Sequence, residues 1–177
     1  MRDGAGFTVV EAATVLAVLA VVVTLAVPSL RAYADRQRLD GAAATLAADL
    51  LQARMEAVVR QEAVRVSTLD DGADGHCVAV HTGPSSGCTC RATRTPAAAC
   101  AHDALLLRHL HLRAADRVRV AATAPSLQFD PQLGTCTPTG SFVLSAPNGD
   151  AVHHIVNVMG RVRSCSPAGR VSGHVAC

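Results

Sequence analysis

The sequence predicts an α+β fold, in which one long N-terminal helix packs on an antiparallel β-sheet domain. Two patterns predict it. Residues 7–62 carry an apolar run followed by helical spacing, whereas residues 63–177 carry short alternating runs bounded by Gly, Pro, Asp and Asn. A helix followed by strands is the α+β arrangement. The length of 177 residues accommodates one membrane helix and one β-rich domain of ordinary size.

The first apolar run is long enough to cross a membrane. Residues 7–27 contain no charged side chain except Glu11, and at about 1.5 Å per residue they extend about 31 Å, the thickness of a bilayer core. We therefore assign residues 7–30 to a transmembrane helix. An ionised carboxylate inside this helix costs about 3 kcal/mol on insertion scales, so Glu11 is expected to meet a cation.

Three features of this end resemble the signal of type IV pilins and pseudopilins: Gly6, residues 7–11 (FTVVE) and Pro28. The resemblance implies that residues 1–6 are a leader, and that a prepilin peptidase cleaves between Gly6 and Phe7 and methylates the new amino terminus. It implies also that Glu11 neutralises the amine of Phe7 on a neighbouring pilin subunit. The chain would then cross the inner membrane once, with a periplasmic domain, until it assembles into a pilus or pseudopilus.

Two simpler interpretations of this end stay open. Arg2 and the A-x-A pattern of residues 32–34 fit a secretory signal peptide, although residues 12–27 exceed its usual apolar core of about 7 to 15 residues and Glu11 stays unexplained. An ordinary membrane anchor with an incidental glutamate is the other interpretation.

After Pro28 the chain turns polar but keeps helical spacing, so residues 31–62 are predicted to continue the helix as an amphipathic segment. Its expected buried stripe comprises Leu39, Leu46, Leu50, Ala53 and Ala57. Strands are predicted at 64–68, 77–81, 107–112, 118–122, 127–129, 141–145 and 152–159. The turn sequence PNGD at 147–150 predicts a hairpin between the last two.

All seven cysteines lie after the predicted helix, which favours an oxidising compartment where disulfides persist. Cys88 and Cys90 are too close in sequence to bridge each other readily. Each is expected to pair with Cys77 or Cys100, in an order that the sequence leaves open. These bridges would staple a Cys-rich loop over residues 76–103.

The other cysteines lie further along. Cys165 and Cys177 are expected to close the C-terminal tail into a ring, and Cys136 is left over. A metal site is the alternative for the cluster, built from Cys88, Cys90 and Cys100 with His76, His81 or His102. Because the paired C-x-x-C spacing of zinc sites is missing, we expect disulfides, no metal and no cofactor.

One short motif has a catalytic form. Residues 83–87 (GPSSG) match the G-x-S-x-G nucleophile elbow, but that mechanism requires a helix directly after the serine, and a Cys-rich loop follows here. His109 and His111 alternate with leucines, as on the outward face of a strand. We therefore predict a protein that is not an enzyme.

Further segments resemble the GspH/FimT family of minor pilins: residues 46–57, 127–135, 141–144 and 155–163. The resemblance does not explain residues 70–125. In this family, GspH-type members are pseudopilins of type II secretion, whereas FimT-type members belong to type IV pili. Some FimT-type members bind DNA during natural transformation through a C-terminal G-R-x-R motif, which residues 160–163 (GRVR) match.

The chemistry of the motif suits a phosphate backbone. The candidate DNA-binding residues are Gly160, Arg161, Arg163 and Arg170. In an extended chain the two motif arginines share one face, about 6.6 Å apart, while Val162 turns inward. One guanidinium group can donate two hydrogen bonds to the oxygens of a phosphate. Gly160 has no side chain that would block the approach of the DNA backbone. No acidic residue follows Asp150, so the tail 160–177 is locally basic.

The sequence therefore predicts a FimT-like minor type IV pilin that binds DNA non-specifically during natural transformation. The alternative is a GspH-like structural subunit of a type II secretion pseudopilus without DNA binding, whose arginines are only solvated. The net charge of +2 does not indicate a nucleic-acid partner by itself. Four more basic residues would widen the DNA surface if they lie nearby: His109, His111, Arg117 and Arg119.

Overall fold

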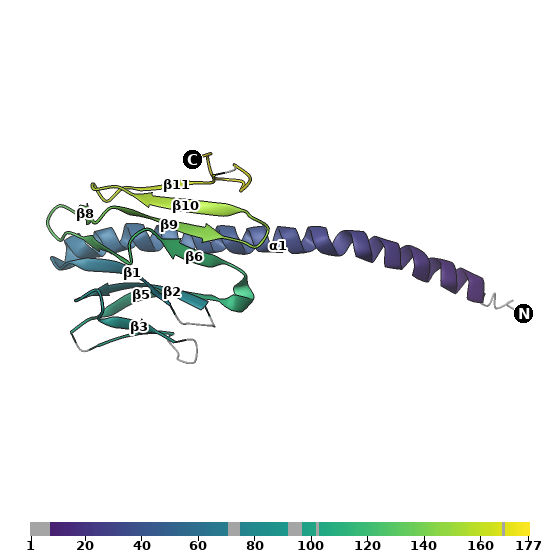
Figure 1. Cartoon of the computed structure of the whole chain (residues 1–177), viewed down its shortest axis with the longest axis horizontal. Helices are drawn as coiled ribbons and strands as arrows, with labels where there is room; N and C mark the ends of the chain where they lie inside the picture. The colour runs from purple at the N-terminus through teal and green to yellow at the C-terminus, as the bar shows by residue number, and fades with distance from the viewer. Residues whose placement is uncertain (1–7, 71–74, 92–96, 102, 168) are drawn as a thin grey trace, which may run out of the picture. The chain divides into compact units, whose positions relative to one another are not determined.

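The computed structural model describes residues 8–70, 75–91, 97–101, 103–167 and 169–177 (Figure 1). The chain forms two compact units, Met1–Ala34 and Asp35–Cys177. Helix α1 (Val9–Arg60) begins in the first unit, continues through Pro28 and ends in the second. Within the described part of the chain, α1 is the one helix that is long and apolar enough to cross a membrane.

In the second unit, one face of α1 forms a wall of the core. The residues that the helical spacing selected are all fully buried: Leu39, Leu46, Leu50, Ala53 and Ala57. Two carboxylates of the helix are buried as well, and each meets an arginine. Asp49 lies 2.6 Å from Arg108, and Asp35 lies 3.1 Å from Arg117. These pairs compensate charges that would otherwise be costly to bury.

Strands follow α1 and pair antiparallel. The larger sheet has the order β5 (Leu106–Arg113), β2 (Gly75–Thr82), β1 (Val64–Asp70), β7 (Ser126–Phe129), β8 (Cys136–Thr137). The smaller sheet has the order β11 (Val162–Cys165), β10 (Ala151–Val156), β9 (Gly140–Ser145), β6 (Arg119–Ala122). A ribbon of β3 (Cys88–Cys90) and β4 (Ala98–Cys100) forms a third, two-stranded sheet. A short 3-10 helix, η2 (Ala114–Asp116), follows β5.

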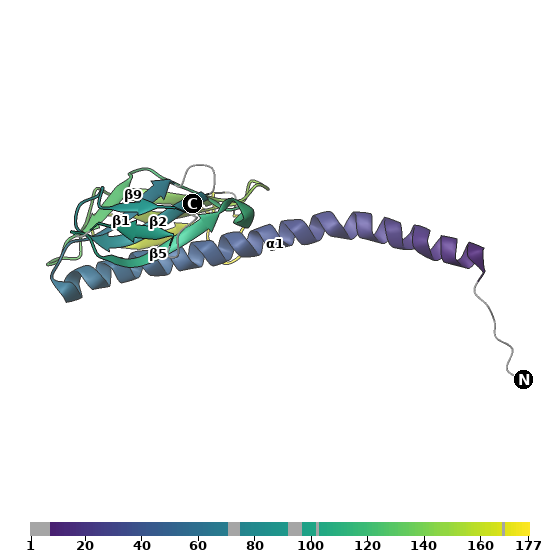
Figure 2. The same cartoon turned by 90° about the horizontal axis from the view of Figure 1, so that it is seen from below.

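The core lies between α1 and the inward faces of the two larger sheets (Figure 2). Alternate residues of a strand point inward, so that Val64 and Val66 of β1 and Phe142 and Leu144 of β9 are buried. Phe129 and Phe142 are the largest fully buried side chains. Aliphatic residues fill the rest, in keeping with an aromatic content of 2%.

The predicted strands are present, but the prediction of one strand over 152–159 is wrong. β10 ends at Val156, where the chain turns back. The next strand, β11, pairs with β10. The alternation of apolar residues continues through Val158, so the sequence pattern does not reveal the turn. In the structure the turn contains Gly160, which has a φ of +67°. Residues 162–165, which the sequence assigned to the basic tail, therefore lie in strand β11. This strand forms a β-hairpin with β10.

The Cys-rich segment 76–103 is also not a simple loop, since it contains most of β2 and all of β3 and β4. Three disulfides are present: Cys77–Cys90, Cys88–Cys100 and Cys165–Cys177. The first two give the order that the sequence left open. Cys136 is a buried free thiol, and burial raises its pKa to about 11.

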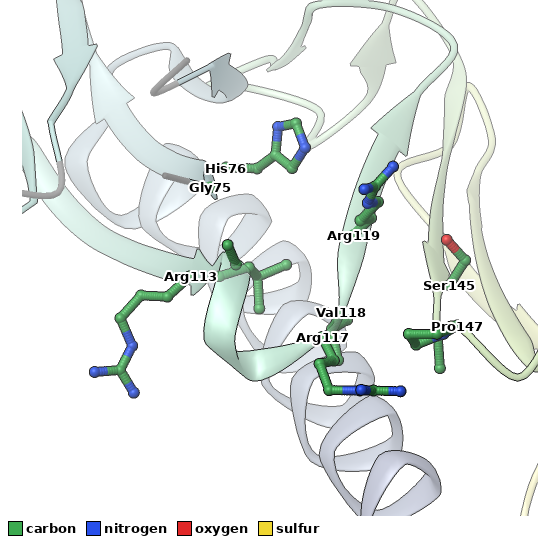
Figure 3. Close-up of a pocket in the computed structure, with 11 residues that line it drawn as sticks. Gly75, His76, Arg113, Arg117, Val118, Arg119, Ser145 and Pro147 are labelled. Atoms are coloured by element: carbon green, nitrogen blue, oxygen red, sulfur yellow. The ribbon is translucent and has the colours of Figure 1, made fainter. Parts of the chain in front are cut away.

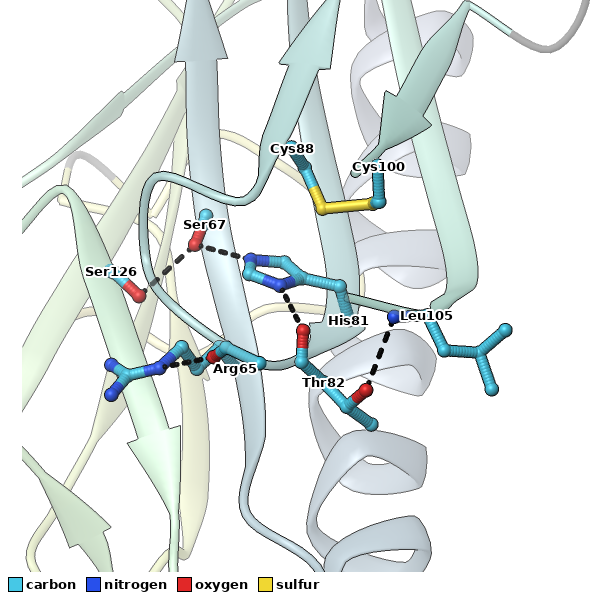
Figure 4. Close-up of a disulfide and its surroundings, with 9 residues drawn as sticks. Arg65, Ser67, His81, Thr82, Cys88, Cys100, Leu105 and Ser126 are labelled. Carbon is cyan, nitrogen blue, oxygen red and sulfur yellow. Dashed lines mark hydrogen bonds between the residues drawn. A yellow bond between two sulfur atoms is a disulfide. The ribbon is translucent and has the colours of Figure 1, made fainter. Parts of the chain in front are cut away.

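A buried polar cluster lies beside the Cys88–Cys100 disulfide (Figure 4). The Nε2 atom of His81 lies 2.9 Å from the Ser67 hydroxyl, and its Nδ1 atom lies 2.9 Å from the carbonyl oxygen of Thr82. Burial lowers the pKa of His81. Because Ser67 is 1% exposed and His81 0%, the pair is closed to a substrate and joins β1 to β2.

Candidate nucleic-acid interface

The motif GRVR lies at the β10–β11 turn, which we define as residues 157–161. Three hydrogen bonds close this turn. The Gly160 amide donates to the Asn157 carbonyl oxygen at 2.9 Å, and the Arg161 amide donates to the Asn157 side-chain oxygen at 2.9 Å. The Asn157 amide in turn donates to the Arg161 carbonyl oxygen at 3.2 Å. Arg161 is therefore fixed at the start of β11 and does not lie on a free tail.

The glycine of the motif has a packing role that sequence reasoning missed. A β-carbon at Gly160 would overlap the carbonyl oxygen of Gly134 and would lie 3.1 Å from the Cδ and Nε atoms of Arg54. The Nε atom of Arg54 donates a hydrogen bond to that same Gly134 oxygen at 3.1 Å. Arg54 thus supports the turn from α1. The signal available in the sequence was a glycine on each of the two loops. The structure shows the reason, since both glycines have a positive φ.

The two arginines of the motif are presented to solvent. Arg161 and Arg163 are exposed, whereas Val162 between them is partly buried and packs against the core, as the alternation predicted. Neither arginine forms an ion pair within the described residues. The four strands of the smaller sheet contain no Asp or Glu. The positive charge of Arg161 and Arg163 is therefore uncompensated by the sheet that carries them.

Arg170 lies in a different setting. Its guanidinium pairs with the Asp150 carboxylate at 3.2 Å and donates to the Gly149 carbonyl oxygen at 3.0 Å. Asp150 is only 2% exposed and also pairs with Arg36 at 2.8 Å. The hydrogen bond from Arg36 and its charge lower the pKa of Asp150, against the effect of burial. Arg170 thus fastens the tail to the β9–β10 turn, and its charge is compensated there.

The other basic residues considered from the sequence do not join the motif. β6, which carries Arg119, is the edge opposite to β11 in the smaller sheet, and β5, which carries His109 and His111, belongs to the larger sheet. Figure 1 shows β11 and β5 on opposite sides of the domain. His109, His111 and Arg119 therefore do not lie beside Arg161, and the condition under which they would widen the surface is not met.

A second basic region is a groove of about 760 Å³ between β2, β5, η2, β6 and β9 (Figure 3). Most of its charge is already paired. Arg113 lies 3.1 Å from Asp116, and Arg117 lies 3.1 Å from Asp35. Arg119 is the groove arginine without an ion pair among the described residues. We therefore place the candidate interface at the β10–β11 turn.

The residues assigned to processing lie at the other end of the chain. Gly6 and Phe7 are outside the described residues. Glu11 lies in the first turn of α1, where its amide donates to the Thr8 hydroxyl at 3.2 Å, a contact typical of a helix N-cap. The Glu11 side chain is exposed and has no ion-pair partner in the described part of the chain.

Comparison with known proteins agrees with this architecture. The family model of the type II transport protein GspH matches residues 42–160. The matched region ends just before the two motif arginines. No curated protein matches the chain. The type IV minor pilin FimU of Pseudomonas aeruginosa, in space group P21, is 23% identical over 74% of this chain and 90% of FimU, with a TM-score of 0.50.

FimU in space group P65 is 21% identical over 71% of this chain and 91% of FimU, with a TM-score of 0.48. The likeness to the P21 form shows a pilin-like fold, with one long apolar helix and antiparallel sheets. The family match extends over more than half of the chain. The chain therefore belongs to the GspH family and is a minor pilin or pseudopilin of the GspH/FimT type.

Proposed function

We propose that this minor pilin is FimT-like and binds DNA non-specifically during natural transformation, by contacts of Arg161 and Arg163 with phosphate oxygens. One observation carries the proposal: both arginines are exposed and have no ion pair among the described residues, next to a sheet whose strands hold no acidic side chain. Adjacent guanidinium groups suit bidentate contacts with phosphate. Binding acts by electrostatic capture and requires no catalytic group.

The test is a salt titration of DNA binding by the full-length chain in a non-ionic detergent. Two phosphate contacts give a slope of about −1.8 for log K against log salt. Arg161→Ala with Arg163→Ala should abolish retention of DNA at low salt, and the sequence of the DNA should matter little. Retention by the double variant equal to that of the wild type would contradict the role of the motif.

Arg119→Ala is the matched control for a single arginine variant. Arg119 is an exposed arginine on the opposite edge of the same sheet and has no ion pair among the described residues. Its replacement removes the same charge but no proposed phosphate contact. We expect Arg161→Ala to weaken binding and Arg119→Ala to leave it close to wild type. Equal losses would indicate that only net charge matters.

Assembly is the second part of the proposal. In our proposal a prepilin peptidase removes residues 1–6 and methylates Phe7, and α1 holds the protein in the inner membrane with its domain in the periplasm. Glu11 then neutralises the amine of Phe7 on a neighbouring subunit, which removes the cost of a lone carboxylate in the membrane. Mass spectrometry of the mature protein tests the cleavage, and a first residue other than Phe7 would refute it.

A second candidate is a structural pseudopilin of type II secretion, which the match to the GspH family model favours. This candidate uses the same anchor and fold but needs no DNA contact. It predicts that deletion of the protein impairs secretion and leaves transformation intact. The FimT-like candidate predicts the reverse. Measuring both phenotypes in one deletion strain separates them.

A further inference from the structure

The β10–β11 turn exposes apolar side chains where turns are usually polar. Val158 is 56% exposed and Met159 is 57% exposed. Leu133, in the loop before β8, is 74% exposed. That loop adjoins the turn, because the Cys136 amide donates to the Val158 carbonyl oxygen at 2.9 Å and Gly134 packs against Gly160. Adjacent exposed apolar residues of this kind mark an interaction surface.

The apolar tip, Val158 and Met159, and the motif arginines are held together. Arg161 lies two residues after Met159 in the same closed turn, and Arg163 follows on β11. An acidic group is present in the loop before β8, but the Asp130 carboxylate accepts hydrogen bonds from the amides of that loop. The exposed side chains of Arg161 and Arg163 beside the tip favour a partner that offers negative charge next to an apolar contact, as a DNA groove does.

The residue types favour the groove of a duplex over stacking on single-stranded bases. Stacking platforms use aromatic side chains, but the described aromatic residues of the second unit, Phe129 and Phe142, are buried in the core. Apolar side chains such as Met, by contrast, recur in proteins that press on base steps in the minor groove while basic residues hold the backbone.

We propose that Val158 and Met159 lie against the sugars and base edges in a groove of duplex DNA. This inference rests on the DNA binding proposed above and adds a contact that salt does not screen. Phosphate contacts set the slope of log K against log salt, whereas an apolar contact changes affinity equally at every salt concentration. The two kinds of residue are therefore separable in one titration.

The experiment compares the full-length wild type with Val158→Ser, Met159→Ser and the double variant, in a non-ionic detergent, on a short labelled duplex. The double variant should bind about ten-fold more weakly at every salt concentration, with an unchanged slope. Val175→Ser is the matched control, since Val175 is 64% exposed on the C-terminal tail. Val175→Ser should bind as the wild type does, and thermal melts should show all variants folded.

The outcomes distinguish the two proposals. If the double variant and Val175→Ser bind alike, the apolar contact is refuted, while weaker binding by the variant without Arg161 and Arg163 still supports the proposed function. If the double variant changes the slope, the tip acts only by placing the arginines and the inference is wrong. Normal DNA binding together with impaired association with other pilin subunits would assign the tip to a protein partner instead. Absence of DNA binding by the wild type would remove both proposals.

Discussion

The α-carbon of Gly160 lies so close to Gly134 that a β-carbon on it would overlap the Gly134 carbonyl oxygen. Gly160 also has a φ of +67°, which side chains rarely adopt. Gly160→Ala is therefore expected to lower the free energy of unfolding by more than about 2 kcal/mol. Urea denaturation measures the loss. Because the same turn carries Arg161, DNA retention should fall too.

Gly173→Ala is the control for this prediction. Gly173 has a φ of +87°, but nothing lies within 4 Å of the position of its β-carbon. Its replacement should cost only the conformational part, about 1 kcal/mol. Equal losses of stability for the two variants would show that the close approach to Gly134 does not matter.

Most of the fold could be predicted because its patterns are local. The buried stripe of α1 follows from helical spacing, and most strands follow from alternation between turn residues. The turn after Val156 could not be found in this way, because apolar residues continue through it. β3, β4 and β8 are two or three residues long and leave too short a pattern.

The site was predictable only in part, because its members come from distant segments. Alternation correctly placed Arg161 and Arg163 outward, on either side of Val162. The pairing of Arg170 with Asp150 and the support from Arg54 depend on contacts between segments far apart in sequence. Spacing along the chain carries no information on such contacts.

His154 should make the domain less stable in mild acid. It is fully buried, and burial with the nearby charge of His174 lowers its pKa from 6.5 to about 4. Between pH 6.5 and pH 4 the unfolded chain therefore binds a proton that the folded domain does not. The stability present above pH 6.5 falls as the pH drops to 4, by up to about 3 kcal/mol. Chemical denaturation across this range measures it.

His154→Asn should flatten this dependence, since asparagine keeps a polar atom near the Ser164 hydroxyl, which lies 2.8 Å from the His154 Nδ1 atom. Part of the slope should remain, because burial also lowers the pKa of His81. His109→Asn is the control, because His109 is an exposed histidine of β5 in the other sheet. A wild-type slope in His154→Asn would contradict the assignment.

Cys136 should resist thiol reagents in the folded protein. The residue is fully buried, and burial raises its pKa to about 11, so the reactive thiolate is scarce near neutral pH. Thiol titration of the native protein should detect no free thiol, and unfolding without a reductant should reveal one. Additional thiols under those conditions would contradict the three disulfides.

The Cys165–Cys177 disulfide should stabilise the C-terminal segment without being needed for DNA binding. It closes a loop with a sequence separation of 12, for which loop entropy predicts about 3 kcal/mol. Cys165→Ser with Cys177→Ser should therefore lower the free energy of unfolding by that amount. The variant should also expose the residues after Ser166 to proteases.

DNA retention by this double serine variant should stay close to wild type at temperatures where it is folded. Arg161 and Arg163 are held by the turn and by pairing of β11 with β10, upstream of the bridge. Arg170 lies inside the ring, but Asp150 already compensates its charge. Weaker DNA binding in a variant that circular dichroism shows to be folded would mean that the ring contributes to the interface. The slope of log K against log salt would then become shallower by about one for each phosphate that the variant no longer binds.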